Sequence, residues 1–204
     1  MKPLIFLLAF LWLSAAVSGA IYLSQVESTP ADSNVSYPQV FPADSRLEHD
    51  PDRSTLIFFA HPKCPCTRAS LAELSRLMTD LNGKLRAYVV FIKPKGETDE
   101  WTDTSSRSTA EAIPGVSVVI DDEERETDIF SAQTSGLVLL YDRNGNLKFN
   151  GGITASRGHE GDNAGRDAIF QIVTSSEERN GQSFVFGCRL HKKDCPGELI
   201  KTEN

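Results

Sequence analysis

Short apolar runs alternate with segments of helical spacing along most of the chain. Runs rich in β-branched and aromatic side chains predict buried strands, and apolar residues spaced three and four apart predict helices with one buried face. The expected order is β-α-β-α-β-α-β-β-α, with strands at 56–60, 85–92, 116–120, 137–141 and 146–150 and helices around 71–81, 104–113, 121–132 and 168–173. This pattern alone predicts a mixed α/β domain without an internal repeat.

The N-terminal segment, residues 1–26, is apolar on all sides. No charged residue occurs from Pro3 to Val26, and about 20 apolar residues are enough to span a bilayer. Lys2 precedes the run, which favours an orientation with the N-terminus inside and the rest of the chain outside. The alternative is a cleaved signal peptide, with residues 18–20 (SGA) as a small-residue cleavage site. In either case the rest of the chain is exported to an oxidising compartment.

Composition divides the rest of the chain into three parts. Residues 27–53 are rich in Ser, Pro, Asp and Asn and are expected to form a flexible linker. Residues 54–176 contain the predicted strands and helices, and residues 177–204 form a tail with two cysteines. The net charge of −7 offers no basic face, so we expect no nucleic-acid partner.

Two cysteines, Cys64 and Cys66, lie where the first predicted strand meets the first predicted helix. Pro65 suits the first helical position, where its missing N–H group costs nothing, and Cys64 is then the N-cap. Unpaired N–H groups, the positive end of the helix dipole and the charges of Lys63 and Arg68 all favour the thiolate, which is the nucleophilic form of cysteine. The sequence therefore predicts a reactive cysteine pair at a helix N-terminus.

This junction carries a resemblance to a known superfamily. Residues 58–66 (FFAHPKCPC) can be laid without gaps on the pattern F-W-A-x-W-C-G-P-C, and so resemble the active-site element of thioredoxin-like proteins. The runs CPCTRAS (64–70), GGIT (151–154) and SRGHEGDN (156–163) are similar to small membrane-anchored bacterial proteins of the RedB type. The resemblance implies a thioredoxin-like fold, a central mixed β-sheet flanked by helices, with a central insertion.

Two positions depart from the superfamily pattern. The motif is C-x-C rather than C-x-x-C, because Lys63 falls where the attacking cysteine is expected and Cys64 follows one residue later. The superfamily also places a cis-proline before the fourth strand, where its loop holds the backbone of a partner. Gly136 falls at the matching position here. A cis peptide bond without proline costs roughly 2.5 to 4 kcal/mol, so we expect a trans bond.

The tail contains the other two cysteines, Cys188 and Cys195. In an exported domain, a structural disulfide between them would fix the tail. The alternative is that either cysteine exchanges electrons with Cys64 and Cys66, which sequence spacing cannot decide.

A metal site is the alternative use of the same residues. His61, Cys64 and Cys66 are ligand types that suit Cu(I) or Zn, and His191 near the tail cysteines offers a second cluster. The loop 156–163 contains charged residues around two glycines and can hold a substrate or a cation, or can be a solvated loop capped by Asn163.

The preferred hypothesis is a single-pass protein of the bacterial inner membrane with its C-terminal domain in the periplasm. It performs thiol–disulfide exchange with a thiol- or disulfide-containing protein partner and uses no cofactor. Cys64 is expected to be the exposed, attacking cysteine and Cys66 the resolving one, with Lys63, Pro65, His61 and Gly136 as supporting residues. The alternatives are a copper- or zinc-binding delivery module and a redox-inactive interaction domain.

Overall fold

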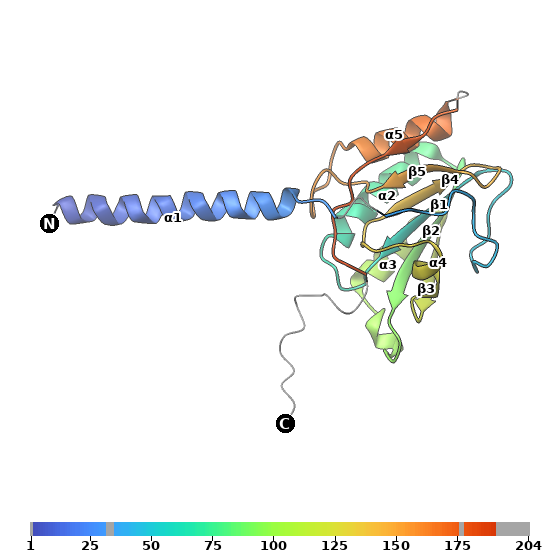
Figure 1. The fold of residues 1–204 in the computed structure, drawn as a ribbon, viewed down its shortest axis with the longest axis horizontal. Coiled ribbons are helices and arrows are strands. Elements are labelled where there is room, and N and C mark those ends of the chain that lie inside the picture. Colours follow the sequence, from blue (N-terminus) through green and yellow to red (C-terminus); the bar gives the residue numbers. More distant parts are fainter. Residues whose placement is uncertain (1, 32–34, 176–177, 191–204) are drawn as a thin grey trace.

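The strands predicted from the apolar runs form a single twisted sheet in the computed structural model, which describes residues 2–31, 35–175 and 178–190. In the described residues the sheet has six strands in the order β3-β2-β1-β4-β5-β6 (Figure 1). Their bounds are β1 Ser54–Ala60, β2 Leu85–Lys93, β3 Val116–Asp122, β4 Val138–Tyr141, β5 Leu147–Gly151 and β6 Gly181–Gln182. The first five confirm the predicted strands, whereas the short β6 was not predicted.

Strand directions follow from the connections. β1, β2 and β3 are parallel neighbours joined through helices, as parallel strands require. β4 runs antiparallel to β1 and to β5. The predicted turn at 142–145 closes the β4–β5 hairpin, and the Asp142 carboxylate accepts the backbone N–H groups of Asn144 and Asn146, each at 2.9 Å.

Helices cover one face of the sheet. α2 Thr67–Leu81, α3 Ser105–Glu111 and α5 Ala164–Thr174 confirm the predicted helices, and their apolar side chains pack with those of the strands in one core. Leu71, Leu74 and Leu81 of α2 are fully or almost fully buried there. The predicted face of this helix is therefore the face that holds it to the sheet.

The opposite face of the sheet is covered mainly by irregular segments. α4 Arg125–Ile129 is short, and the rest of the cover comes from residues 37–47 and 185–190. Leu47 and Leu190 are buried, and the Tyr141 hydroxyl donates to the Pro38 carbonyl at 3.0 Å. Part of the stretch that we expected to be a flexible linker, within residues 37–47, therefore packs on the sheet, because strands that are apolar on both faces need a second cover.

The N-terminal helix α1, Lys2–Ser28, projects away from the domain (Figure 1). From Pro3 to Ser28 it has a mean hydropathy of 2.3 over its most apolar window, and it is the one helix of the described residues that is long and apolar enough to cross a membrane. It fits a membrane anchor or a signal sequence. The η1 turn at Asp99–Trp101 is the remaining helical element of the described residues.

Candidate redox site

The cysteine turn follows the C-terminal end of β1, an interior strand of the sheet. At its end, the backbone N–H of His61 donates to the Ser135 hydroxyl at 2.9 Å, and the N–H of Cys64 donates to the His61 carbonyl at 3.1 Å. The Thr67 N–H then donates to the Cys64 carbonyl at 3.1 Å, and α2 begins at Thr67. The cysteines therefore lie between a buried strand and a helix, as the sequence predicted.

The start of the helix differs from the prediction by two residues. Cys66, not Cys64, is the N-cap, with helical φ and ψ of −68° and −24° and no side-chain capping bond. Pro65 lies in the turn before the helix and not at its first position. The reason is local: the bond from Thr67 to the Cys64 carbonyl closes a separate turn around Pro65 and Cys66.

The exposure of the two cysteines is also the reverse of the prediction. Cys64 is only 4% exposed, whereas Cys66 is half-buried. The helix start alone would leave Cys64 accessible, but its sulfur lies 2.9 Å from the sulfur of Cys188, in the C-terminal part of the chain. A contact between residues this far apart in sequence could not be read from local spacing.

We call residues 185–190 the C-terminal segment. It pairs with the loop that precedes β4: the N–H of Ser135 donates to the Cys188 carbonyl at 2.8 Å, and the N–H of Leu190 donates to the Gln133 carbonyl at 2.9 Å. The approach is so close at Gly187 that a Cβ atom there would lie 1.8 Å from the Ser135 carbonyl oxygen. Backbone pairing and this glycine place Cys188 over Cys64.

Gly136 belongs to the same loop and has a φ of +96°, a conformation that favours glycine. Its N–H donates to the Phe59 carbonyl at 2.8 Å, which fixes the loop to β1. The described residues contain no cis peptide bond, so the trans bond expected at this position is confirmed.

Three cysteines, Cys64, Cys66 and Cys188, thus meet as free thiols. The first of the predicted tail pairings joined Cys188 to Cys195, and Cys195 lies outside the described residues. Its disulfide with Cys188 therefore stays a prediction. The second pairing, a contact between a tail cysteine and the cysteine turn, is present.

The three thiols shift one another's protonation in opposite directions. Hydrogen bonds from the thiols of Cys188 and Cys66, and from their backbone N–H groups, hold the pKa of Cys64 well below its usual range although burial opposes the shift. The pKa values of Cys66 and Cys188 are raised, because each thiol donates to the Cys64 thiolate and is partly buried. The arrangement stabilises one thiolate, on Cys64.

Arg157 supplies the positive charge of the site. Its guanidinium donates to the Gly187 carbonyl at 2.7 Å, and its charge acts on Cys66 and Cys188, opposing the rise of both pKa values. Sequence reasoning placed Arg157 in the loop 156–163 without giving it this role. The chemical signal was present, because an arginine in a cysteine-containing domain is a candidate partner for a thiolate.

The Lys63 side chain contacts Trp101. Its ammonium group lies 3.7 Å from the centroid of the Trp101 ring, a cation–π contact, and the groups that lower the pKa of Cys64 most are the thiols of Cys188 and Cys66. The ring of His61 is buried, packs edge-on against Trp101 with centroids 5.6 Å apart, and its Nδ1 accepts the Lys63 N–H at 3.2 Å. Lys63 and His61 therefore help to shape the turn.

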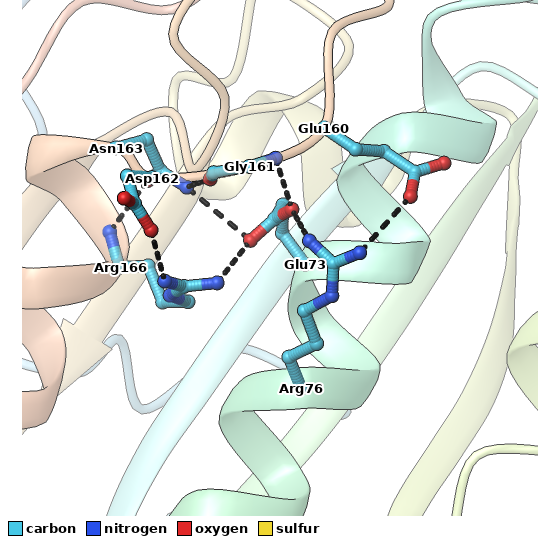
Figure 2. Close-up of polar contacts among 7 residues, drawn as sticks. All are labelled: Glu73, Arg76, Glu160, Gly161, Asp162, Asn163 and Arg166. Carbon is cyan, nitrogen blue, oxygen red and sulfur yellow. Dashed lines mark hydrogen bonds and ion pairs between the residues drawn. The ribbon is translucent and has the colours of Figure 1, made fainter.

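The loop 156–163 is held to α2 by a buried carboxylate, as Figure 2 shows. Glu73 is completely buried and pairs with Arg166 at 2.7 Å and with Arg76. The same carboxylate accepts the Gly161 N–H at 2.7 Å, while Asn163 caps α5 as predicted by accepting the Arg166 N–H at 2.8 Å. The charged run of this loop is therefore structural at its C-terminal end, and it anchors the loop that presents Arg157.

The chain is similar to several solved structures. An uncharacterized conserved protein of Geobacillus kaustophilus is 16% identical with a TM-score of 0.61, and the match covers 82% of this chain and 98% of that one. A hypothetical protein of Sinorhizobium meliloti 1021 is 16% identical with a TM-score of 0.59, covering 79% and 97%. The exposed lipoprotein thioredoxin of Streptococcus pneumoniae strain TIGR4 is 14% identical with a TM-score of 0.43, covering 68% and 98%. No protein-family model and no curated protein matches the chain.

The strand arrangement decides the fold. A parallel β1–β2 unit, an antiparallel β4–β5 hairpin beside β1 and a cysteine turn at the end of β1 occur together. The chain has a thioredoxin-like fold. Within it, β3 and α3 are the predicted central insertion, and the narrower RedB-type resemblance stays a prediction.

The same geometry bears on the alternative metal site predicted at His61, Cys64 and Cys66. Within residues 2–31, 35–175 and 178–190, no group of three or more His, Cys, Asp or Glu side chains is arranged to hold a metal ion. The His61 ring packs on Trp101 and receives the Lys63 N–H, as described above. The second cluster predicted around His191 and Cys195 lies outside the described residues.

Proposed function

We propose that this protein carries out thiol–disulfide exchange through Cys64 while tethered to a membrane. The observation that carries the proposal is the 2.9 Å contact between the sulfurs of Cys64 and Cys188, in a site where hydrogen bonding with Cys188 and Cys66 lowers the pKa of Cys64. Exchange requires a thiolate, and a thiol whose pKa is lowered by its neighbours supplies one at neutral pH. A buried cysteine with a purely packing role needs no such donors.

In this proposal the Cys64 thiolate attacks a disulfide of a protein partner. One partner sulfur becomes bonded to Cys64, and the other leaves as a thiolate. Because Cys64 is only 4% exposed, the C-terminal segment must move aside before a partner can reach it. The segment lies outside the named strands and is held by backbone hydrogen bonds, the Arg157 guanidinium and the buried Leu190, so its opening breaks these contacts but does not require the sheet to unfold.

The proposed location is the inner membrane of a bacterium, with α1 as a single-pass anchor and the domain in the periplasm. The apolar length of α1 and the single Lys2 at its start support this orientation. A reporter enzyme fused after residue 30 should be active outside the cytoplasm, and the protein should sediment with membranes. Soluble periplasmic protein with a new N-terminus near Ile21 would overturn the anchor but not the export.

The exchange reaction is tested with the detergent-solubilised full chain. The reduced protein should react with glutathione disulfide to give an intramolecular disulfide, and Cys64→Ser should abolish the reaction. Chelators should leave the activity intact, and purified protein should carry less than stoichiometric copper or zinc. Tight one-to-one Cu(I) binding that is lost in His61→Ala would instead favour the metal-delivery alternative, and unreactive thiols throughout would favour the redox-inactive one.

A further inference from the structure

The C-terminal segment brings a third cysteine to Cys64 through a docking site that is built into the fold. The segment is anchored on both sides of Cys188: Leu190 is completely buried, and the Gly187 carbonyl receives the Arg157 guanidinium at 2.7 Å. Ser135 adds a hydrogen bond to the carbonyl of Cys188 itself, at 2.8 Å. These contacts fix the sulfur of Cys188 at 2.9 Å from that of Cys64.

We infer that Cys188 is the resolving cysteine for Cys64, so that the working disulfide joins the cysteine turn to the C-terminal segment. This assignment rests on the proposed exchange function and names the second thiol of that reaction. It replaces Cys66, which the sequence had suggested for the role. A disulfide needs the sulfurs at about 2.05 Å, so closing the Cys64–Cys188 bond requires a movement of less than about 1 Å from the observed contact.

Cys66 is placed less favourably for the same bond. It has helical backbone angles, and its carbonyl accepts the Ser70 N–H in the first turn of α2. The Cys66 thiol also hydrogen-bonds to Cys64, but its backbone is fixed in the first turn of α2, so drawing the two sulfurs into a disulfide would need this turn to change. Cys188 lies on a segment outside the helices, whose backbone pairs with the loop before β4.

The reaction then has two balanced steps. In the first, the Cys64 thiolate attacks the partner's disulfide, forms a mixed disulfide and releases one partner thiolate, which takes up the proton of Cys188. In the second, the Cys188 thiolate attacks the sulfur of Cys64, forms the Cys64–Cys188 disulfide and releases the second partner sulfur as a thiolate. The partner disulfide is reduced by two electrons, and the two protein cysteines are oxidised by two electrons. A protein dithiol that attacks the Cys64–Cys188 disulfide reverses the sequence.

The positive charge of Arg157 supports the second step. While Cys64 is a thiolate, its negative charge favours the protonated form of Cys188. That charge is absent once Cys64 is in a mixed disulfide, whereas the Arg157 guanidinium remains bonded to the neighbouring Gly187 carbonyl. The site therefore favours the Cys188 thiolate at the stage at which it must attack.

The test maps the disulfide by mass spectrometry. Full-length reduced protein in detergent is treated with glutathione disulfide, free thiols are alkylated, and the linked peptides are identified. We expect a Cys64–Cys188 peptide. Cys188→Ser should lose that bond and accumulate glutathione on Cys64. Cys66→Ser should still form the Cys64–Cys188 bond, but more slowly because one donor to Cys64 is lost, and the matched control Cys195→Ser should give the parent's bond and little adduct.

The outcomes separate this inference from the proposed function. A Cys64–Cys66 or Cys188–Cys195 bond in protein that still consumes glutathione disulfide would overturn the role of Cys188 and leave the exchange function standing. Glutathione accumulating on Cys64 in Cys66→Ser rather than in Cys188→Ser would do the same. Parent protein that neither consumes glutathione disulfide nor forms a mixed disulfide would overturn the exchange function itself. Mapping the parent protein requires no substitution, so a variant that fails to fold cannot hide the answer.

Discussion

Two buried acidic groups lie near the start of α2, Glu73 within the helix and Cys64 just before it, and their hydrogen-bonding partners differ in kind. Glu73 is completely buried and faces two arginines, a backbone N–H and the Asn163 amide (Figure 2). Cys64 is nearly as buried, but its sulfur faces the thiols and backbone N–H groups of Cys66 and Cys188. Both sets of partners stabilise a negative charge. Only the partners of Cys64, which are thiols, can be oxidised.

This difference separates structure from function. The partners of Glu73 are arginines, which stay charged at every physiological pH, so the network is permanent and holds the loop 156–163 to α2. The partners of Cys64 are thiols, which lose their protons and their donor capacity when they are oxidised. An anion held by oxidisable donors is therefore suited to exchange, whereas an anion held by guanidinium groups is suited to scaffolding.

The largest expected effect comes from removing the reactive sulfur. Cys64→Ser should reduce the exchange rate with glutathione disulfide to background, because a hydroxyl group cannot replace a thiolate in this reaction. The rate is measured by following glutathione release. The fold should be retained, because serine is close in size to cysteine. Exchange at the parent rate in Cys64→Ser would assign the reaction to another cysteine.

Removing the charge of Glu73 should affect stability and not the chemistry. Glu73→Gln leaves Arg166 without its buried carboxylate and should lower the free energy of unfolding by about 3 kcal/mol, measured by denaturant titration. Asp162→Asn is the matched control, because Asp162 is fully exposed and also pairs with Arg166, at 3.5 Å. The control should show no measurable change. Equal effects of the two substitutions would contradict the scaffolding role of Glu73.

The lowered pKa of Cys64 should make the stability of the reduced protein depend on pH. The thiolate contributes stability that is fully present above the pKa of an unfolded cysteine, about 8.5, and is lost as the pH falls toward the lower folded value. Between pH 8 and pH 6, the free energy of unfolding should fall by about 2 kcal/mol more in the parent than in Cys64→Ser. Parallel curves for the two proteins would show that the folded and unfolded pKa values are alike.

A smaller effect is expected from loosening the C-terminal segment. Gly187→Ala would drive a Cβ atom into the Ser135 carbonyl, so the segment must shift, at a cost of about 1 kcal/mol in unfolding free energy. Alkylation of Cys64 by a small reagent should become faster. Phe184→Ala, at a side chain that is 62% exposed, is the control and should leave the rate unchanged. An unchanged rate in Gly187→Ala would contradict the covering role of the segment.

The sheet and its helices were predictable because each strand carries its own apolar signal. Strands such as 56–60 and 85–92 are apolar on both faces, and α2 has a continuous apolar stripe. The cover over the second face was not predictable, because residues 37–47 and 185–190 have no periodic pattern and are fixed only by what they pack against. The position of a cysteine turn after the first strand also followed from the sequence.

Only some of the residues of the site could be predicted from the sequence. Cys64 and Cys66 were identified from their place between strand and helix, whereas the contact of Cys188 with Cys64 spans 124 positions of sequence. Lys63 was the obvious cation by adjacency, yet its side chain turns to Trp101, and the charge near Cys188 comes from Arg157. Adjacent residues in a turn can point to different sides, so sequence distance did not predict which charge acts.

The most direct measurement is the ultraviolet titration of the thiolate in the fully reduced protein, compared with Cys64→Ser. Hydrogen bonds from Cys188 and Cys66 hold the pKa of Cys64 low, so the parent should retain the absorbance of one thiolate well below pH 7, and the variant should lack it. The absorbance requires no reagent to enter the site, so the burial of Cys64 does not affect it. A parent protein whose first thiolate appears only near the ordinary cysteine value of about 8.5 would contradict the account.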